Sequence, residues 1–215
     1  YSWRSMGEFL DRIQERKPVL NLAQLVGHAT IRIAAASTRR GAMKSDELKN
    51  CLAKVEQSLD EGACGLSFGL GYDPGIWSPK EEVEAFSAVA AKAKKPVTAH
   101  LRSYCRMSEA YSLLSFKPHN LLALQEMIDV ARSTGVSLQV SHAMVLFHVT
   151  WPTVDRYLGM IDEARSQGLD VVIDAIPYAE LNGSVSTLLP LWFIARLPQG
   201  YKSRWARMRI NVESS

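Results

Sequence analysis

Residues 120–142, NLLALQEMIDVARSTGVSLQVSH, contain one complete helix–turn–strand unit that ends in a histidine. Apolar residues in the first half recur at the helical period, and Gly135 provides a stop signal. The apolar run 136–141 has the length of a buried strand, and His142 follows it directly. This stretch therefore predicts a helix and then a strand whose carboxyl end carries His142.

The same alternation extends in both directions along the chain. Further helices are predicted from 5 to 16, 45 to 62, 78 to 94 and 150 to 168, and further strands at 20–27, 64–70, 96–101 and 169–173. Ser78 is the predicted cap of the helix that starts at Pro79, with Glu81 as its partner. Strands joined by helices run parallel, because a parallel pair needs a crossover connection.

Right-handed crossovers leave two architectures, an open doubly wound sheet and a (β/α)8 barrel. The chain has 215 residues, and about five strands are visible where a closed barrel has eight and usually takes about 250 residues. No glycine-rich phosphate loop opens a helix, which weighs against a nucleotide-binding sheet. We expect an α/β fold of parallel (β/α) units, an incomplete TIM-barrel-like domain that occupies residues 1–215 as one domain.

The composition is that of a soluble globular protein, with 47% hydrophobic residues, 22% charged residues and a net charge of +3. We expect no nucleic-acid partner, no membrane span, no signal peptide and a cytoplasmic location. The cysteines form no CxxC pair and are expected to be reduced, with two of them buried, Cys51 and Cys64. A basic cluster favours a solvated helix face over an anion site; its members are Arg196, Lys202, Arg204, Arg207 and Arg209.

Polar residues follow several of these strands at their carboxyl ends, where barrel active sites are built. They are His28, His100, His142 and Asp174. Neighbouring strands lie about 4.8 Å apart, so imidazoles from adjacent strand ends can reach one metal ion. Imidazole and carboxylate are suitable zinc ligands, and zinc lowers the pKa of a bound water towards about 7. From the spacing alone, core histidines and metal ligands are about equally well supported.

Six segments carry a resemblance to a known family. They are 1–10 (YSWRSMGEFL), 21–28 (NLAQLVGH) with Arg32, 62–70 (GACGLSFGL) with Tyr72 and Pro74, 100–102 (HLR), 141–142 (SH) and 174–178 (DAIPY). In this order they resemble segments of the N-acyl-D-amino-acid deacylase (D-aminoacylase) group of the amidohydrolase superfamily. The resemblance extends to about Trp192.

The resemblance implies a zinc-dependent hydrolase of non-peptide C–N amide bonds, with one or two zinc ions and an N-acyl amino acid or related amide as substrate. His100 and His142 match the group's metal-ligand positions. The group's HxH pair, bridging ligand and catalytic aspartate have no counterpart in this sequence. Because catalytic zinc normally takes three protein ligands, we expect this chain alone to be poor at chemistry.

The resemblance also implies roles for residues around the metal. Arg102 is a candidate for binding a substrate carboxylate, with a structural or surface ion pair as the alternative. Tyr178 is expected to line the substrate pocket, and His28 to touch substrate or a neighbouring side chain. Asp174 is expected to orient neighbouring groups rather than to act as acid or base.

Two departures from the group bear on the substrate. Met144 stands where the group has a lysine for the substrate carboxylate, and Arg102 is followed by a longer connection that reaches Pro118. That connection is either a pocket wall for an apolar acyl group or a loop that packs on its own barrel; its candidate side chains are Tyr104, Met107, Tyr111 and Phe116. The departures predict a divergent branch whose substrate need not be an acyl-D-amino acid.

Two other readings remain open. A partial barrel has two open sheet edges and an uncovered apolar interior, which favours a non-catalytic, self-associating fragment and a homo-oligomer. An open doubly wound domain with a different ligand is the third reading.

Overall fold

The fold is built on one parallel sheet in a computed structural model that describes residues 3–37, 40–112, 114–178, 191–196 and 199–213. The sheet has five strands in the order β1-β2-β3-β4-β5. All four strand pairs are parallel. The strands are β1 (Leu25–Gly27), β2 (Gly65–Gly69), β3 (Val97–His100), β4 (Leu138–Val140) and β5 (Val171–Ile173).

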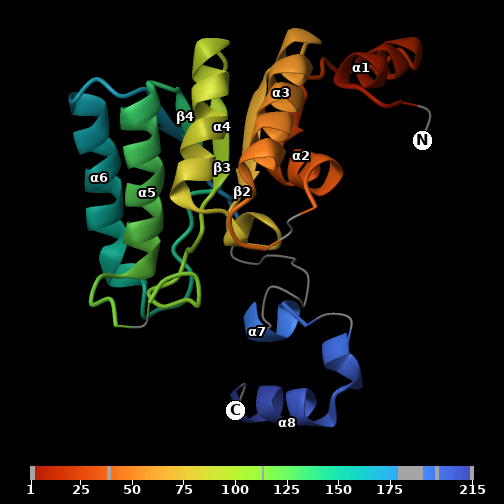
Figure 1. Ribbon diagram of the computed structural model, residues 1–215. Coiled ribbons are helices and arrows are strands. Elements are labelled where there is room, and N and C mark those ends of the chain that lie inside the picture. Colours follow the sequence, from red (N-terminus) through yellow and green to blue (C-terminus); the bar gives the residue numbers. More distant parts are fainter. Residues whose placement is uncertain (1–2, 38–39, 113, 179–190, 197–198, 214–215) are drawn as a thin grey trace.

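Four long helices cover one face of this sheet (Figure 1). They are α3 (Ser45–Asp60), α4 (Lys80–Lys92), α5 (His119–Thr134) and α6 (Val154–Ser166), and each packs against the next. The other helical elements are α1 (Met6–Glu15), α2 (His28–Ala35), η1 (Gly75–Trp77), η2 (Trp151–Thr153), α7 (Leu191–Ile194), η4 (Gln199–Lys202) and α8 (Arg204–Glu213). Sequential strands with helices on one face form a barrel wall, whereas a doubly wound sheet has a switched strand order and helices on both faces. The predicted incomplete barrel is confirmed over the doubly wound alternative.

The hydrophobic core lies between the sheet and these helices. Side chains alternate along each strand, so one set faces the helices and is buried; it includes Leu66, Phe68, Val97, Ala99, Leu138 and Val140. The opposite set is half-buried and polar at the centre of the sheet, where Ser67, Thr98 and Gln139 stand in register. The expected apolar interior is therefore wrong for the central strands. Among the residues of the five strands, the exposed apolar side chains are Val172 and Ile173 in β5.

Most predicted elements are confirmed, with shorter strands than expected. The helix around residues 120–134 ends at Gly135, which has φ 70° and so adopts the left-handed conformation that glycine favours. The strand predicted at 20–27 is restricted to β1, and Leu20 and Leu22 before it are exposed. Helix α2 was not predicted, because it begins at His28 immediately after β1.

The start of α4 differs from the predicted capping arrangement. The helix begins at Lys80, and Pro79 occupies the cap position, so Ser78 lies outside the helix. The Ser78 hydroxyl is buried and accepts a hydrogen bond from Arg32 Nη1 at 3.1 Å. The prediction was wrong because a long-range buried partner, invisible in the local sequence, takes the Ser78 oxygen.

The basic cluster lies in and beside the C-terminal elements α7, η4 and α8, which are separate from the long helices (Figure 1). Arg209 lies over the ring of Trp192 with its guanidinium carbon 4.3 Å from the centroid, and Arg196 lies 5.7 Å from that of Trp205. Part of the cluster thus stacks on aromatic rings, while the Arg207 side chain lies outside the described atoms. No helix among the residues that the structure describes could span a lipid bilayer.

The three cysteines are free thiols in three different environments. Cys51 is buried as expected. Cys64 is exposed, so the expectation of a buried side chain is wrong there. It precedes β2 rather than lying inside it.

Candidate functional site

His100 and His142 meet at the carboxyl ends of the neighbouring strands β3 and β4. His100 Nδ1 lies 3.0 Å from His142 Nε2, and the two ring centroids are 4.7 Å apart with planes at 71°. His100 lies on the same sheet face as Thr98, the face that the helices leave uncovered. The structure therefore brings together the two histidines that the sequence placed at adjacent strand ends.

The electrostatics around this histidine pair favour a neutral His100 ring. Burial, with a smaller contribution from His142, lowers the pKa of His100 to about 4. His100 is therefore uncharged at neutral pH, which is the state in which an imidazole nitrogen binds a metal ion. His142 Nδ1 is buried and has no hydrogen-bond partner among the described residues.

The backbone of His142 is held in an uncommon conformation. Its φ of 38° lies in the left-handed region, which a non-glycine residue adopts at some cost in energy. The Asp174 carboxylate accepts a hydrogen bond from the His142 backbone N–H and another from the Gln139 amide. The Asp174 carbonyl accepts from the Ala143 N–H at 2.7 Å. Asp174 thus lies where it orients His142, and its role in function stays a prediction.

The β2–α4 loop packs closely against His100. A Cβ at Gly71 would lie 2.7 Å from His100 Nε2, so only glycine leaves room for the imidazole there. The ring of Tyr72 lies 5.0 Å from that of His100, centroid to centroid. Gly71 was not singled out from the sequence, because its use depends on a contact between segments about 30 residues apart in the chain.

The fit of a metal ion to this pair is partial. Two nitrogens bound at about 2.0–2.1 Å to one tetrahedral zinc ion lie about 3.3 Å apart, close to the 3.0 Å between His100 Nδ1 and His142 Nε2. Among the described residues no cluster of three or more His, Cys, Asp or Glu side chains is arranged to hold a metal. The described part of the chain therefore offers two candidate metal ligands and no arranged set of three.

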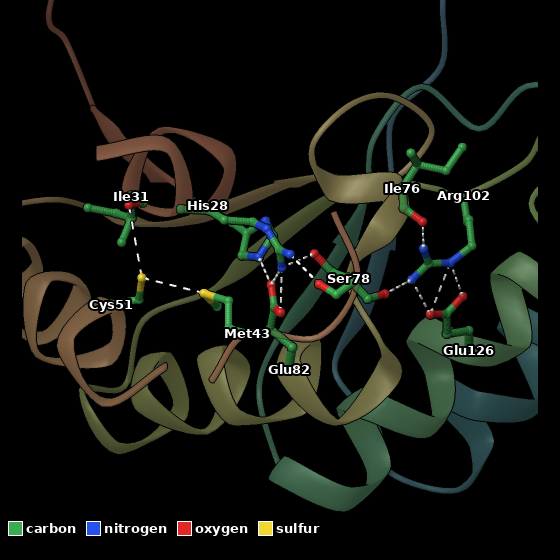
Figure 2. Close-up of polar contacts among 11 residues, drawn as sticks. His28, Ile31, Met43, Cys51, Ile76, Ser78, Glu82, Arg102 and Glu126 are labelled. Atoms are coloured by element: carbon green, nitrogen blue, oxygen red, sulfur yellow. Dashed lines mark hydrogen bonds and ion pairs between the residues drawn. The ribbon is translucent and has the colours of Figure 1, made fainter. Parts of the chain in front are cut away.

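His28 belongs to a different cluster, on the helix-covered side of the sheet (Figure 2). It is fully buried, and its Nε2 lies 2.8 Å from Glu82 Oε1. Arg32 pairs with the same carboxylate and is also fully buried. Phe68 and Phe86 flank the His28 ring at 5.0 and 4.7 Å between centroids. Because no surface of His28 is accessible, the geometry favours a structural role over the expected contact with substrate.

Arg102 is likewise committed to protein partners (Figure 2). It pairs with Glu126 through Nη2 at 2.7 Å and Nε at 3.0 Å, and it donates to the carbonyls of Ile76 at 2.9 Å and Ser78 at 3.0 Å. Tyr111 donates to Glu126 at 2.7 Å. The Arg102 side chain is 7% exposed. The geometry thus favours the alternative role, a structural ion pair, over a contact with a substrate carboxylate.

The remaining expected pocket residues differ in their environments: Tyr104 lies beside the histidines, and three others are exposed. Tyr178 is exposed (77%), and so are Met107 (65%) and Phe116 (102%) in the long connection. Tyr104 is buried beside the histidine pair, with its ring centroid 4.9 Å from that of His100. A cavity of about 710 Å³ lies elsewhere, lined by residues of η1, the start of α4 and α5, with Arg102 and Glu126 in its wall.

The fold agrees with comparisons to known proteins. No protein-family model matches the sequence. The N-acyl-D-glutamate deacylase of Alcaligenes xylosoxydans xylosoxydans is 30% identical over 185 residues, which cover 86% of this chain and 35% of that protein. The D-aminoacylase of the same organism is 26% identical over 178 residues. The chain is homologous to the D-aminoacylase group of amidohydrolases.

Solved structures of the same group of proteins are similar to this chain. The N-acyl-D-glutamate deacylase from Bordetella bronchiseptica, solved with zinc and a phosphonate inhibitor, has a TM-score of 0.74 and 29% identity over 81% of this chain. A D-aminoacylase structure has a TM-score of 0.73 and 25% identity over the same share. The chain spans about a third of the length of these relatives, 34% of each solved chain.

Proposed function

We propose that this chain forms the part of a metal-dependent amide hydrolase that supplies His100 and His142 as ligands to one metal ion, with zinc as the ion. The observation that carries the proposal is the 3.0 Å separation of the two imidazole nitrogens at adjacent strand ends. The similarity to N-acyl-D-amino-acid deacylases supports the same class of chemistry. A zinc ion bound there would polarise the carbonyl of an amide substrate.

The residues around the pair would prepare it for binding. Burial favours the neutral form of His100, which leaves one of its two ring nitrogens without a proton at neutral pH. Asp174 holds the backbone of His142 through its N–H, which directs the ring. Gly71 lets the β2–α4 loop close over His100. The described residues together supply no set of three metal ligands. We therefore propose that the chain alone binds metal weakly and turns over little substrate.

For the substrate we propose a linear amide without the carboxylate of an acyl-D-amino acid, because this chain lacks a free cationic side chain at the described positions expected to bind that carboxylate. Arg102 is occupied by Glu126, and Met144 is a half-buried thioether without charge. A cytoplasmic setting fits the free thiols, because disulfides are rare in reducing compartments. Comparing hydrolysis of N-acyl-D-glutamate with that of uncharged N-acyl amides tests the substrate class; preference for N-acyl-D-glutamate would refute it.

Zinc titration by calorimetry tests the metal site. The wild-type chain should bind zinc with about one ion per chain, and both His100→Ala and His142→Ala should abolish this binding. His148→Ala is the matched control, because His148 is exposed and lies against Trp151 rather than at the pair. Zinc binding that survives both substitutions, or no binding by the wild type, would refute the proposal.

A second candidate function is self-association without turnover. The outer strand β5 has no further strand paired with it among the described residues, and Val172 and Ile173 there are exposed. Exposed strand edges of this kind pair readily with other chains. Sedimentation of the wild type against Val172→Lys tests it: a dimer that the lysine dissociates supports this function, and a wild-type monomer excludes it.

A further inference from the structure

We propose that the hydroxyl of Tyr104 is the tie that positions the two imidazoles, by holding the ends of β3 and β4 together beyond their regular pairing. This inference rests on the proposed metal-binding function and concerns how the ligand pair is kept at its separation. Tyr104 follows β3, and its side chain is 5% exposed.

The histidines lie past the region where the two strands pair with each other. The register between β3 and β4 ends at Ala99 and Val140, with one further hydrogen bond from Ser141 N to Ala99 O at 3.0 Å. His100 and His142 lie just beyond these residues. Regular strand pairing therefore does not by itself set the distance between the two imidazoles.

One hydroxyl spans this gap. Tyr104 Oη accepts a hydrogen bond from Leu101 N at 2.8 Å and donates one to Ser141 O at 3.0 Å. Leu101 follows His100 directly, and Ser141 precedes His142 directly. A single side chain thus binds the backbone neighbour of each histidine, one on either strand.

The rest of Tyr104 strengthens the same connection. Its ring lies 4.9 Å from the ring of His100 and 5.3 Å from that of His142, centroid to centroid, so it forms a wall against both. Its carbonyl accepts from Leu146 N at 3.0 Å, in the loop after β4. Burial raises the pKa of Tyr104, so the phenol keeps its proton and both donates and accepts at neutral pH.

Substitution of Tyr104 by phenylalanine isolates the hydroxyl, because the ring and its packing remain. Tyr157→Phe is the matched control: Tyr157 is 2% exposed, and its hydroxyl has no hydrogen-bond partner among the described residues. Both variants lose one buried phenolic oxygen, and only Tyr104→Phe loses the tie between the strands. Thermal unfolding of both variants verifies that each is folded at the temperature of measurement.

Zinc titration gives the first readout. Tyr104→Phe should weaken zinc binding by about 10-fold to 100-fold, the usual cost of removing a group that orients metal ligands. Tyr157→Phe should bind zinc as the wild type does. Equal affinity of Tyr104→Phe and the wild type, or an equal loss in both variants, would overturn the proposal.

A second readout needs no metal and separates this inference from the proposed function. In the metal-free chain, ¹⁵N NMR at fixed pH reports which nitrogen of each imidazole carries the proton. The hydrogen bond between His100 and His142 should select one tautomer of each ring in the wild type and in Tyr157→Phe, and Tyr104→Phe should show a mixture. If the wild type fails to bind zinc, the proposed metal site is refuted, and the tautomers still decide whether Tyr104 positions the imidazoles. Unchanged tautomers in Tyr104→Phe would refute that positioning role.

Discussion

His28 and His100 each stand at the end of an apolar strand, and they belong to regions with opposite physical demands. His28 lies among the buried charges between the sheet and α4, where it contacts Glu82 and has no exposed surface. His100 lies on the uncovered face of the sheet, where its nearest polar partner is His142. The same residue type in the same kind of position thus lies in two different environments.

The difference between the two regions follows from which side of the sheet a strand end faces. On the helix side, water is excluded, so each charge needs a partner; Arg32 finds Glu82, and Arg102 finds Glu126. On the uncovered face a side chain is free to meet a ligand. The buried ion pairs on the helix side therefore stabilise the fold, and imidazole nitrogens on the uncovered face are able to bind a ligand.

Replacement of Glu82 by glutamine should have the largest effect on stability. It leaves the buried Arg32 guanidinium without its counter-charge, and breaking one side of a buried ion pair costs about 3–5 kcal/mol. Urea unfolding followed by circular dichroism measures the loss. A loss below about 1 kcal/mol, the range of exposed ion pairs, would contradict the burial of this cluster.

Acid should reproduce part of that loss. Burial raises the pKa of Glu82, but hydrogen bonds from His28, Arg32 and Ser78 and the charge of Arg32 together lower it below its usual 4.5. Because the folded pKa is depressed, the stabilisation is present above pH 4.5 and disappears as the pH falls through the folded pKa. Unfolding free energies measured below pH 4.5 should fall more steeply in the wild type than in Glu82→Gln. Parallel curves would exclude a contribution from Glu82.

Exchanging each histidine for glutamine separates the two regions directly. His28→Gln should destabilise the chain by about 1–3 kcal/mol, because it disturbs the buried hydrogen bond to Glu82 and the packing of the ring against two phenylalanines. His100→Gln should cost less stability and remove zinc binding. Denaturant unfolding and zinc titration on both variants check the contrast. The reverse pattern, with zinc binding lost in His28→Gln and kept in His100→Gln, would contradict the proposed position of the metal site.

The smallest effect is expected at an exposed ion pair. Lys92 Nζ lies 2.8 Å from Glu56 Oε1, and both side chains are more than half exposed, at 77% and 52%. Lys92→Ala should leave the unfolding midpoint unchanged, because water and salt screen such a pair. A loss as large as that of Glu82→Gln would show that burial does not govern these ion pairs.

Much of the fold was predictable from local pattern. The apolar period of residues 120–134, Gly135 and the short apolar run after it correctly predicted α5 and β4. Parallel order followed from the crossover helices. Helix α2 is not predicted from the sequence, because its first residue His28 directly follows β1 without an intervening turn.

The sequence alone determined the strand–helix alternation and the placement of His100 and His142 at neighbouring strand ends, since both follow from hydrophobic period and chain connectivity. Only the tertiary structure decided that Arg102 faces Glu126, that His28 is enclosed, and that Tyr104 reaches both strands. These outcomes depend on which face of the sheet each side chain occupies and on partners many residues away. No local pattern specifies either, because burial and long-range pairing arise only when the elements pack together.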